Sequence, residues 1–80
     1  MRFPDRETVE RVRREYPAGT RVELVRMDDQ QAPPIGTHGT VTGVDDTASI
    51  MVRWDNGSGL HVVYGEDKVR RIQQGTERKE

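Results

Sequence analysis

Residues 50–64 read Ile-Met-Val-Arg-Trp-Asp-Asn-Gly-Ser-Gly-Leu-His-Val-Val-Tyr, two alternating stretches joined by Asp-Asn-Gly. Alternation of apolar and polar residues with a central turn signal predicts a β-hairpin. Asp55, Asn56 and Gly57 have the form of a type I turn that ends in a glycine with positive φ, a common three-residue hairpin loop. We therefore expect these three residues to be structural turn residues at the centre of a small β domain.

The loop length also sets the register of this hairpin. With a three-residue loop, Leu60 faces Val52 and Val62 faces Ile50, so the large apolar side chains share one face. A two-residue Asn-Gly loop would shift the pairing by one residue and divide the apolar side chains between the two faces. The three-residue loop is therefore the prediction.

Residues 5–16, ahead of the hairpin, predict a helix. Asp5 is a suitable N-cap, arginines are concentrated late in the segment, and Pro17 ends it. A narrow apolar stripe along it could lie against the β domain or against a partner; it consists of Val9, Val12 and Tyr16.

The remaining strands complete one domain. Strands are expected over residues 20–27 and 36–44, and a short closing strand near 69–72, while glycines at 36, 39 and 43 indicate bulges or bends. The prediction is a mostly β fold: a small SH3-like five-stranded barrel (about 19–72) preceded by one N-terminal α-helix, with an OB-type barrel as the alternative. Residues 73–80 are polar and aperiodic, which predicts a disordered tail.

Length and composition restrict the class of protein. The chain has 80 residues, 31% of them hydrophobic, and no cysteine, which predicts a single small domain without disulfide or thiolate metal site. Neither an apolar leader nor a long apolar run is present in the sequence. We expect a cytoplasmic protein without a membrane partner.

The net charge of −1 conceals an uneven distribution. Residues 27–67 carry seven acidic side chains against one arginine, a net charge of −6, whereas residues 1–26 and 68–80 are net positive. Acidic loops repel a phosphate backbone and attract cationic groups. Tight binding to duplex DNA is therefore not expected.

Three blocks of the sequence carry a family resemblance. Residues 17–22 (Pro-Ala-Gly-Thr-Arg-Val), 32–46 (Ala-Pro-Pro-Ile-Gly-Thr-His-Gly-Thr-Val-Thr-Gly-Val-Asp-Asp) and 52–58 (Val-Arg-Trp-Asp-Asn-Gly-Ser) resemble the bacterial and phage family called domain of unknown function 4314. The resemblance runs from about residue 17 to 72. It implies a stand-alone SH3-like protein, often carried by phages and mobile elements and then acting in the host cytoplasm, and it implies no activity. The central strands are also similar to the Mind bomb/HERC-type domain of ubiquitin ligases, a protein-interaction module.

The sequence contains no arrangement typical of catalysis. No cysteine nucleophile is present, Ser49 and Ser58 lack a nucleophile-elbow context, and the glycines lack P-loop or dinucleotide spacing. His38 and His61 have no second ligand at metal spacing. We expect no enzyme, no metal and no cofactor.

Protein binding is the leading hypothesis for function. Asp28 and Asp29 begin the long first loop of the predicted barrel, and Trp54 and Tyr64 are the aromatic residues best placed to reach it. Acidic groups beside aromatic rings suit a basic peptide, through charge-assisted hydrogen bonds and cation–π contacts. The alternative for Trp54 is a role in the core.

Two other functions stay open at the level of sequence. The arginine-rich helix and the basic segment 68–71 could form a nucleic-acid-binding face of a small barrel. A phage origin would also suit a small inhibitor or sponge that captures a host defence protein. The oligomeric state is not indicated by the sequence.

Overall fold

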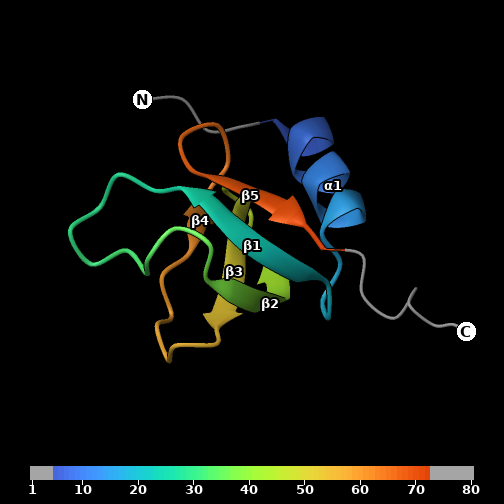
Figure 1. Ribbon diagram of the computed structural model, residues 1–80. Helices are drawn as coiled ribbons and strands as arrows, with labels where there is room; N and C mark the ends of the chain where they lie inside the picture. The colour runs from blue at the N-terminus through green and yellow to red at the C-terminus, as the bar shows by residue number, and fades with distance from the viewer. Residues whose placement is uncertain (1–4, 73–80) are drawn as a thin grey trace, which may run out of the picture.

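The computed structural model describes residues 5–72 and is mostly β (Figure 1). Its elements are one helix and five strands: α1 (Arg6–Glu15), β1 (Arg21–Arg26), β2 (His38–Val44), β3 (Ser49–Trp54), β4 (Val62–Val63) and β5 (Lys68–Arg71). The strands form one antiparallel sheet in the order β4-β3-β2-β1-β5. The predicted N-terminal helix and five strands are confirmed, and the predicted tail of residues 73–80 lies outside the described residues.

Local signals place the helix as expected. The Asp5 carboxylate accepts a hydrogen bond from the Thr8 amide at 2.9 Å, which satisfies one of the free N–H groups of the first turn. Val9 and Val12 are both buried, and α1 contacts β2. The apolar stripe of the helix therefore packs against the sheet, which decides between the two possibilities that the sequence left open.

The hairpin has the predicted loop. Gly57 has φ of +94° and its amide donates to the carbonyl of Trp54 at 2.9 Å, while Val62 pairs with Ile50. The expected pairing of Leu60 with Val52 is not part of the ladder, because β4 comprises only two residues. The Leu60 carbonyl instead accepts a hydrogen bond from the indole N–H of Trp54 at 2.9 Å. The three-residue loop and the pairing of Val62 with Ile50 are confirmed, and the expected pairing of Leu60 with Val52 is wrong.

A glycine in β2 allows the sheet to pack closely over the tryptophan. A Cβ atom at Gly39 would lie 2.6 Å from Cγ1 of Val52 and 2.8 Å from Cε3 of Trp54. Further along β2, the register with β3 shifts between Val41 and Gly43, which confirms the expected bulge. Gly39 is therefore required by the core rather than by a turn.

The sheet is open, so the prediction of a closed barrel is wrong. Closure would require β4 to pair with β5, but the described strands share no ladder at that position. The backbone of Val63 is already used by the bend that follows it. Its N–H donates to Oδ2 of Asp67 at 2.9 Å, and its carbonyl accepts from the amides of Glu66 and Asp67. The edge groups of β4 are therefore not free to pair with β5.

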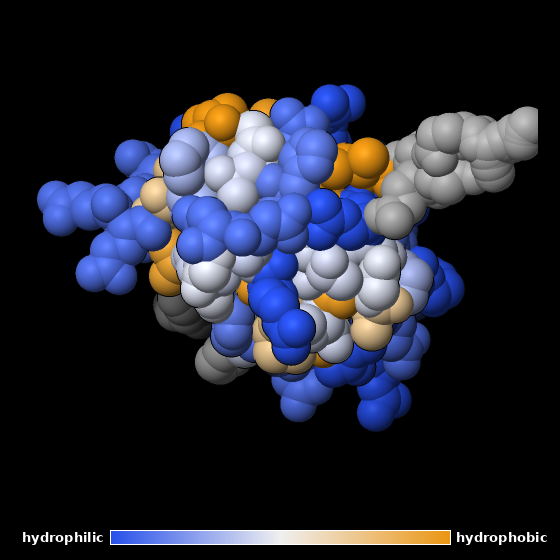
Figure 2. Space-filling view, turned by 60° about the horizontal axis from the view of Figure 1, so that its bottom comes forward, coloured by the Kyte–Doolittle hydropathy of each residue, from blue (hydrophilic) through white to orange (hydrophobic). Residues whose placement is uncertain are grey.

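One hydrophobic core joins the helix to the sheet. Trp54 and Leu24 are its largest fully buried side chains, and the buried set is Val9, Val12, Val22, Leu24, Val41, Val44, Ala48, Ile50, Val52, Trp54 and Val62. The face drawn in Figure 2 is mostly hydrophilic, with hydrophobic residues exposed in small separate patches. Within residues 5–72, α1 is too short and too polar to cross a membrane.

Candidate functional site

A mostly apolar cleft of about 340 Å³ lies where β4 and β5 approach each other without pairing. We call it the tyrosine cleft. Its walls come from the end of α1, from β3 and β4, and from the start of β5, and they comprise Tyr16, Ile50, Val62, Tyr64, Gly65, Asp67, Lys68 and Val69. The open sheet thus leaves an apolar hollow that a closed barrel would have sealed.

Tyr64 is the most accessible aromatic wall of this cleft. Its side chain is 43% exposed, and its hydroxyl oxygen accepts a hydrogen bond from Nη2 of Arg11 at 3.1 Å. A phenol has one proton to donate besides its acceptor capacity. Arg11 therefore fixes the position of the ring, while the hydroxyl proton stays available to a ligand.

Tyr16 also lines the cleft, and an arginine lies close to its ring. The guanidinium carbon of Arg71 lies 5.7 Å from the centre of the Tyr16 ring, within cation–π range. Nη1 of Arg71 also donates to the carbonyl of Glu15 at 3.2 Å. The last strand is thereby joined to the C-terminal end of α1, and a positive charge is held beside the cleft.

The bend between β4 and β5 supplies the polar rim. Gly65, with φ of +93°, turns the chain so that Asp67 and Lys68 line the cleft. One carboxylate oxygen of Asp67 is engaged by the amide of Val63. The charged residues that line the cleft are therefore Asp67 and Lys68, while Arg11 and Arg71 contact the side chains of Tyr64 and Tyr16 from outside the lining.

Of the two aromatic residues predicted for the binding site, only Tyr64 is accessible. Trp54 is 1% exposed, lies in the core and uses its indole N–H on the Leu60 carbonyl. Its ring therefore has no free face for a ligand. The structure gives Trp54 the core role that the sequence left as its alternative.

Asp28 and Asp29 lie elsewhere. Both are exposed in the long loop between β1 and β2, which projects away from α1 in Figure 1. Oδ1 of Asp29 accepts from the Gln31 amide at 2.8 Å, a local turn contact. Among the described residues, no hydrogen bond or ion pair joins either aspartate to Tyr64 or Trp54, and neither lines the tyrosine cleft. The structure does not gather the four predicted residues.

The predicted turn residues serve the fold. Asp55 accepts two hydrogen bonds from the guanidinium of Arg21, at 2.7 and 2.9 Å, which link the hairpin to β1. This pairing lowers the pKa of Asp55 and raises that of Arg21. Oδ1 of Asn56 accepts from the Ser58 amide at 3.0 Å and supports the turn around Gly57.

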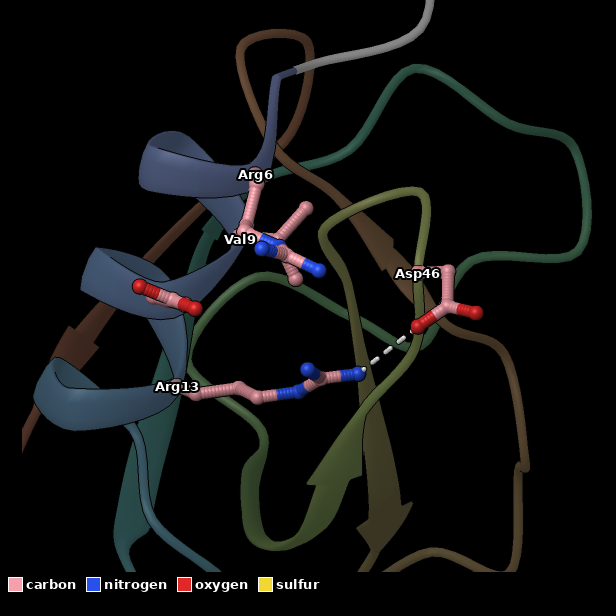
Figure 3. Close-up of a pocket in the computed structure, with 5 residues that line it drawn as sticks. Arg6, Val9, Arg13 and Asp46 are labelled. Atoms are coloured by element: carbon pink, nitrogen blue, oxygen red, sulfur yellow. Dashed lines mark hydrogen bonds and ion pairs between the residues drawn. The ribbon is translucent and has the colours of Figure 1, made fainter.

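A second hollow, of about 490 Å³, lies between α1 and the turn after β2 (Figure 3). Arg13 crosses it: Nη2 meets Oδ1 of Asp46 at 3.0 Å, and Nε donates to the Val44 carbonyl at 3.0 Å. Arg6 and Val9 line the same hollow from the helix. Because Arg13 is already hydrogen-bonded to Val44 and Asp46, its polar contacts across this hollow attach the helix to the sheet.

The acidic residues of the segment 27–67 do not form one face. Asp46 and Asp55 are paired with arginines. Asp45 accepts hydrogen bonds from the amides of Thr47 and Ser49 and from the Thr47 hydroxyl, and the hydroxyl contact is the leading cause of its lowered pKa. Within the described part of the chain, no group of three or more His, Cys, Asp or Glu side chains could hold a metal ion.

Sequence reasoning missed most of the tyrosine cleft. It assigned Tyr16 to the helix stripe and Val69 to a closing strand, and it did not place Lys68 or Arg11 beside Tyr64. Alternation gave no signal for the cleft, because Tyr64 follows the same every-second-residue pattern as Leu60 and Val62. Joining Tyr64 to α1 requires knowledge of a contact between residues 53 positions apart.

The fold and cleft define a class: a small β-rich domain with one N-terminal helix, an open antiparallel sheet and an apolar surface cleft. Within that class, the chain belongs to the family described as Domain of unknown function (DUF4314), whose model matches residues 5–72 and so also includes the helix. The resemblance recognised in the sequence is confirmed. Neither a curated protein nor a solved structure matches the chain.

Proposed function

We propose that this protein is a non-enzymatic binding module whose tyrosine cleft takes up a segment of another protein. The observation that carries the proposal is Tyr64, an exposed aromatic ring fixed by Arg11 over an apolar cleft at the open edge of the sheet. Apolar clefts with a few fixed polar groups are common ligand sites, and exposed tyrosines are enriched among residues that dominate protein interfaces.

The SH3-like comparison and the phage association belong to this proposal. Support for the first comes from β4 and β5, the two edge strands of the sheet, which contact each other without pairing, as expected for a sheet that curls toward closure. Compared with a closed small barrel, this chain keeps a gap between its edge strands. A binding module that acts on a host protein would use that gap without any catalytic group.

The test is selection of peptides from a random display library against the purified protein. Selected peptides are then measured against Tyr64→Ala and against Ile35→Ala, a matched control whose side chain is 63% exposed in the loop between β1 and β2. The proposal requires peptides that lose affinity at least tenfold with Tyr64→Ala and keep it with Ile35→Ala. Equal effects of the two substitutions, or the absence of any Tyr64-dependent peptide, would contradict it.

A second candidate function, nucleic-acid binding, is favoured by one observation. The arginine-rich helix and β5 lie together, since Arg14 and Arg71 line one open hollow near Ile72. A labelled single-stranded oligonucleotide titrated at several salt concentrations separates this candidate from the first, because phosphate contacts give a steep salt dependence. Binding that Arg14→Glu abolishes and Tyr64→Ala leaves intact would establish nucleic acid as the ligand.

A further inference from the structure

We infer that the segment held by the tyrosine cleft is acidic and inserts an apolar side chain, the opposite of the basic peptide expected from the sequence. This inference rests on the proposed function and specifies its partner. It follows from the charges and contacts around the cleft.

Cationic side chains at the cleft are free to bind an anionic group, whereas the carboxylate that lines it, Asp67, already accepts a hydrogen bond from the Val63 amide. Lys68 lines the cleft, Arg11 binds the Tyr64 hydroxyl, and Arg71 lies over the Tyr16 ring. Arg11 and Lys68 are exposed, and no ion pair involves either of them among residues 5–72. Both can therefore meet a carboxylate of a bound segment at the mouth of the cleft.

A basic segment would meet a cationic side chain already placed at each of the two tyrosines. The cation–π position over Tyr16 is held by Arg71, and the Tyr64 hydroxyl already has a cationic neighbour in Arg11. Asp67, the carboxylate that lines the cleft, is committed in part to the Val63 amide. A lysine or arginine brought here would meet like charges at short range.

The interior of the cleft favours an apolar protein side chain over a nucleotide base. Ile50, Val62 and Val69 line it with aliphatic groups; Ile50 and Val62 belong to the buried core, and Val69 is the partly exposed one. A base could stack on the exposed Tyr64 ring, but its polar edges would lie against aliphatic groups that offer them no hydrogen bond. An aliphatic or aromatic side chain flanked by aspartate or glutamate matches both the walls and the rim.

The experiment compares charge variants in the peptide selection, with affinities measured by fluorescence anisotropy of the enriched dye-labelled peptides. Lys68→Glu reverses one charge at the rim of the cleft. Arg53→Glu makes the same change in net charge on β3, outside the cleft, at an exposed residue for which no ion pair is recorded in the described part of the chain. Both sites are exposed strand positions, so both variants should fold.

We expect enrichment of Asp and Glu around an apolar residue. Lys68→Glu should weaken these peptides about five- to tenfold, and Arg53→Glu should change affinity less than about twofold. Raising NaCl from about 50 to about 500 mM should weaken them by a similar factor. A neutral Lys68→Gln variant should give an intermediate loss.

Three results would overturn the inference, and they are distinct. Tyr64-dependent peptides rich in Lys and Arg, or without charge preference, would refute the acidic partner and leave the binding module intact. Tyr64-dependent binding of a single-stranded oligonucleotide in place of peptides would refute it in favour of nucleic acid. The absence of any Tyr64-dependent ligand would remove the proposed function itself.

Discussion

Replacement of Gly39 by alanine tests the packing of the core most directly. The added methyl would lie 2.6 Å from Cγ1 of Val52, 2.8 Å from Cε3 of Trp54 and 3.0 Å from the backbone oxygen of Arg53. Val52 and Trp54 are themselves buried, so neither can rotate into solvent to make room. The strand pairing between β2 and β3, in which Gly39 is opposite Trp54, must shift instead.

The size of the effect follows from two opposing contributions. Overpacking a filled core costs about 1–3 kcal/mol. Against this, alanine restricts the unfolded chain more than glycine does and recovers about 0.4–1 kcal/mol where the native conformation suits it. The clash at Gly39 involves a rigid ring and backbone, so we expect an overpacking cost near the top of its range. After the gain from the unfolded chain is subtracted, the net loss of unfolding free energy is about 2 kcal/mol, which is a substantial share of the stability of a small domain.

Urea unfolding measures this loss, with Trp54, the single tryptophan of the chain, as the fluorescent reporter. Gly59→Ala is the matched control, since a Cβ there would have no heavy atom within 4 Å. We expect a clear fall in the midpoint for Gly39→Ala and a change within about 0.5 kcal/mol for the control. Equal midpoints for the two variants would refute the argument that Gly39 is needed for close packing over the tryptophan.

Three further outcomes are expected. Gly57→Ala should cost about 1 kcal/mol in urea unfolding because a Cβ strains a residue with φ of +94°, and a Gly57→Asn variant should recover part of that loss. Trp54→Ala should cost about 3–5 kcal/mol, measured by circular dichroism since the fluorophore is removed, and a loss below 1 kcal/mol would contradict its core position. Asp45 and Asp55 have lowered pKa values, by hydrogen bonds from Thr47 and Arg21 respectively, so their contribution to stability is present above the ordinary carboxyl pKa of 3.8 and is lost as the pH falls through their lowered values. Asp45→Asn should therefore flatten the dependence of unfolding free energy on pH in that acidic range, and an unchanged slope would show that the carboxylate contributes nothing there.

The sequence by itself determined the parts of this protein that depend on near neighbours in the chain. The cap at Asp5, the left-handed Gly57 and the pairing of Val62 with Ile50 each follow from contacts within about a dozen residues. The strand expected over residues 20–27 is also found as β1, with the alternating residues Val22 and Leu24 buried. Turn chemistry and side-chain periodicity are properties of short segments, so they can be predicted without knowledge of the rest of the fold.

The candidate site was beyond the reach of such local rules. Charge counted along the sequence indicated acidic loops over residues 27–67. In the structure Arg21 pairs with Asp55 and Arg13 with Asp46, each across more than thirty residues, so part of that negative charge is neutralised by residues outside the segment. The alternation of side chains along a strand placed Trp54 on the same face as the core residues. It could not tell whether the ring on that face is buried or accessible. Its burial depends on the bare Cα of Gly39 on the neighbouring strand.

Only the tertiary structure decided that the sheet stays open. The hydrogen bonds of Val63 to Asp67 and Glu66 arise in a bend whose residues look, in sequence, like any polar turn before a final strand. Because those bonds occupy the edge of β4, β5 does not pair with it, and Tyr16 and Tyr64 come to line the cleft beside the two strands. The N–H and C=O groups at the edge of a strand can bond either to another strand or to a nearby bend. Which partner they take depends on the fold of the whole chain.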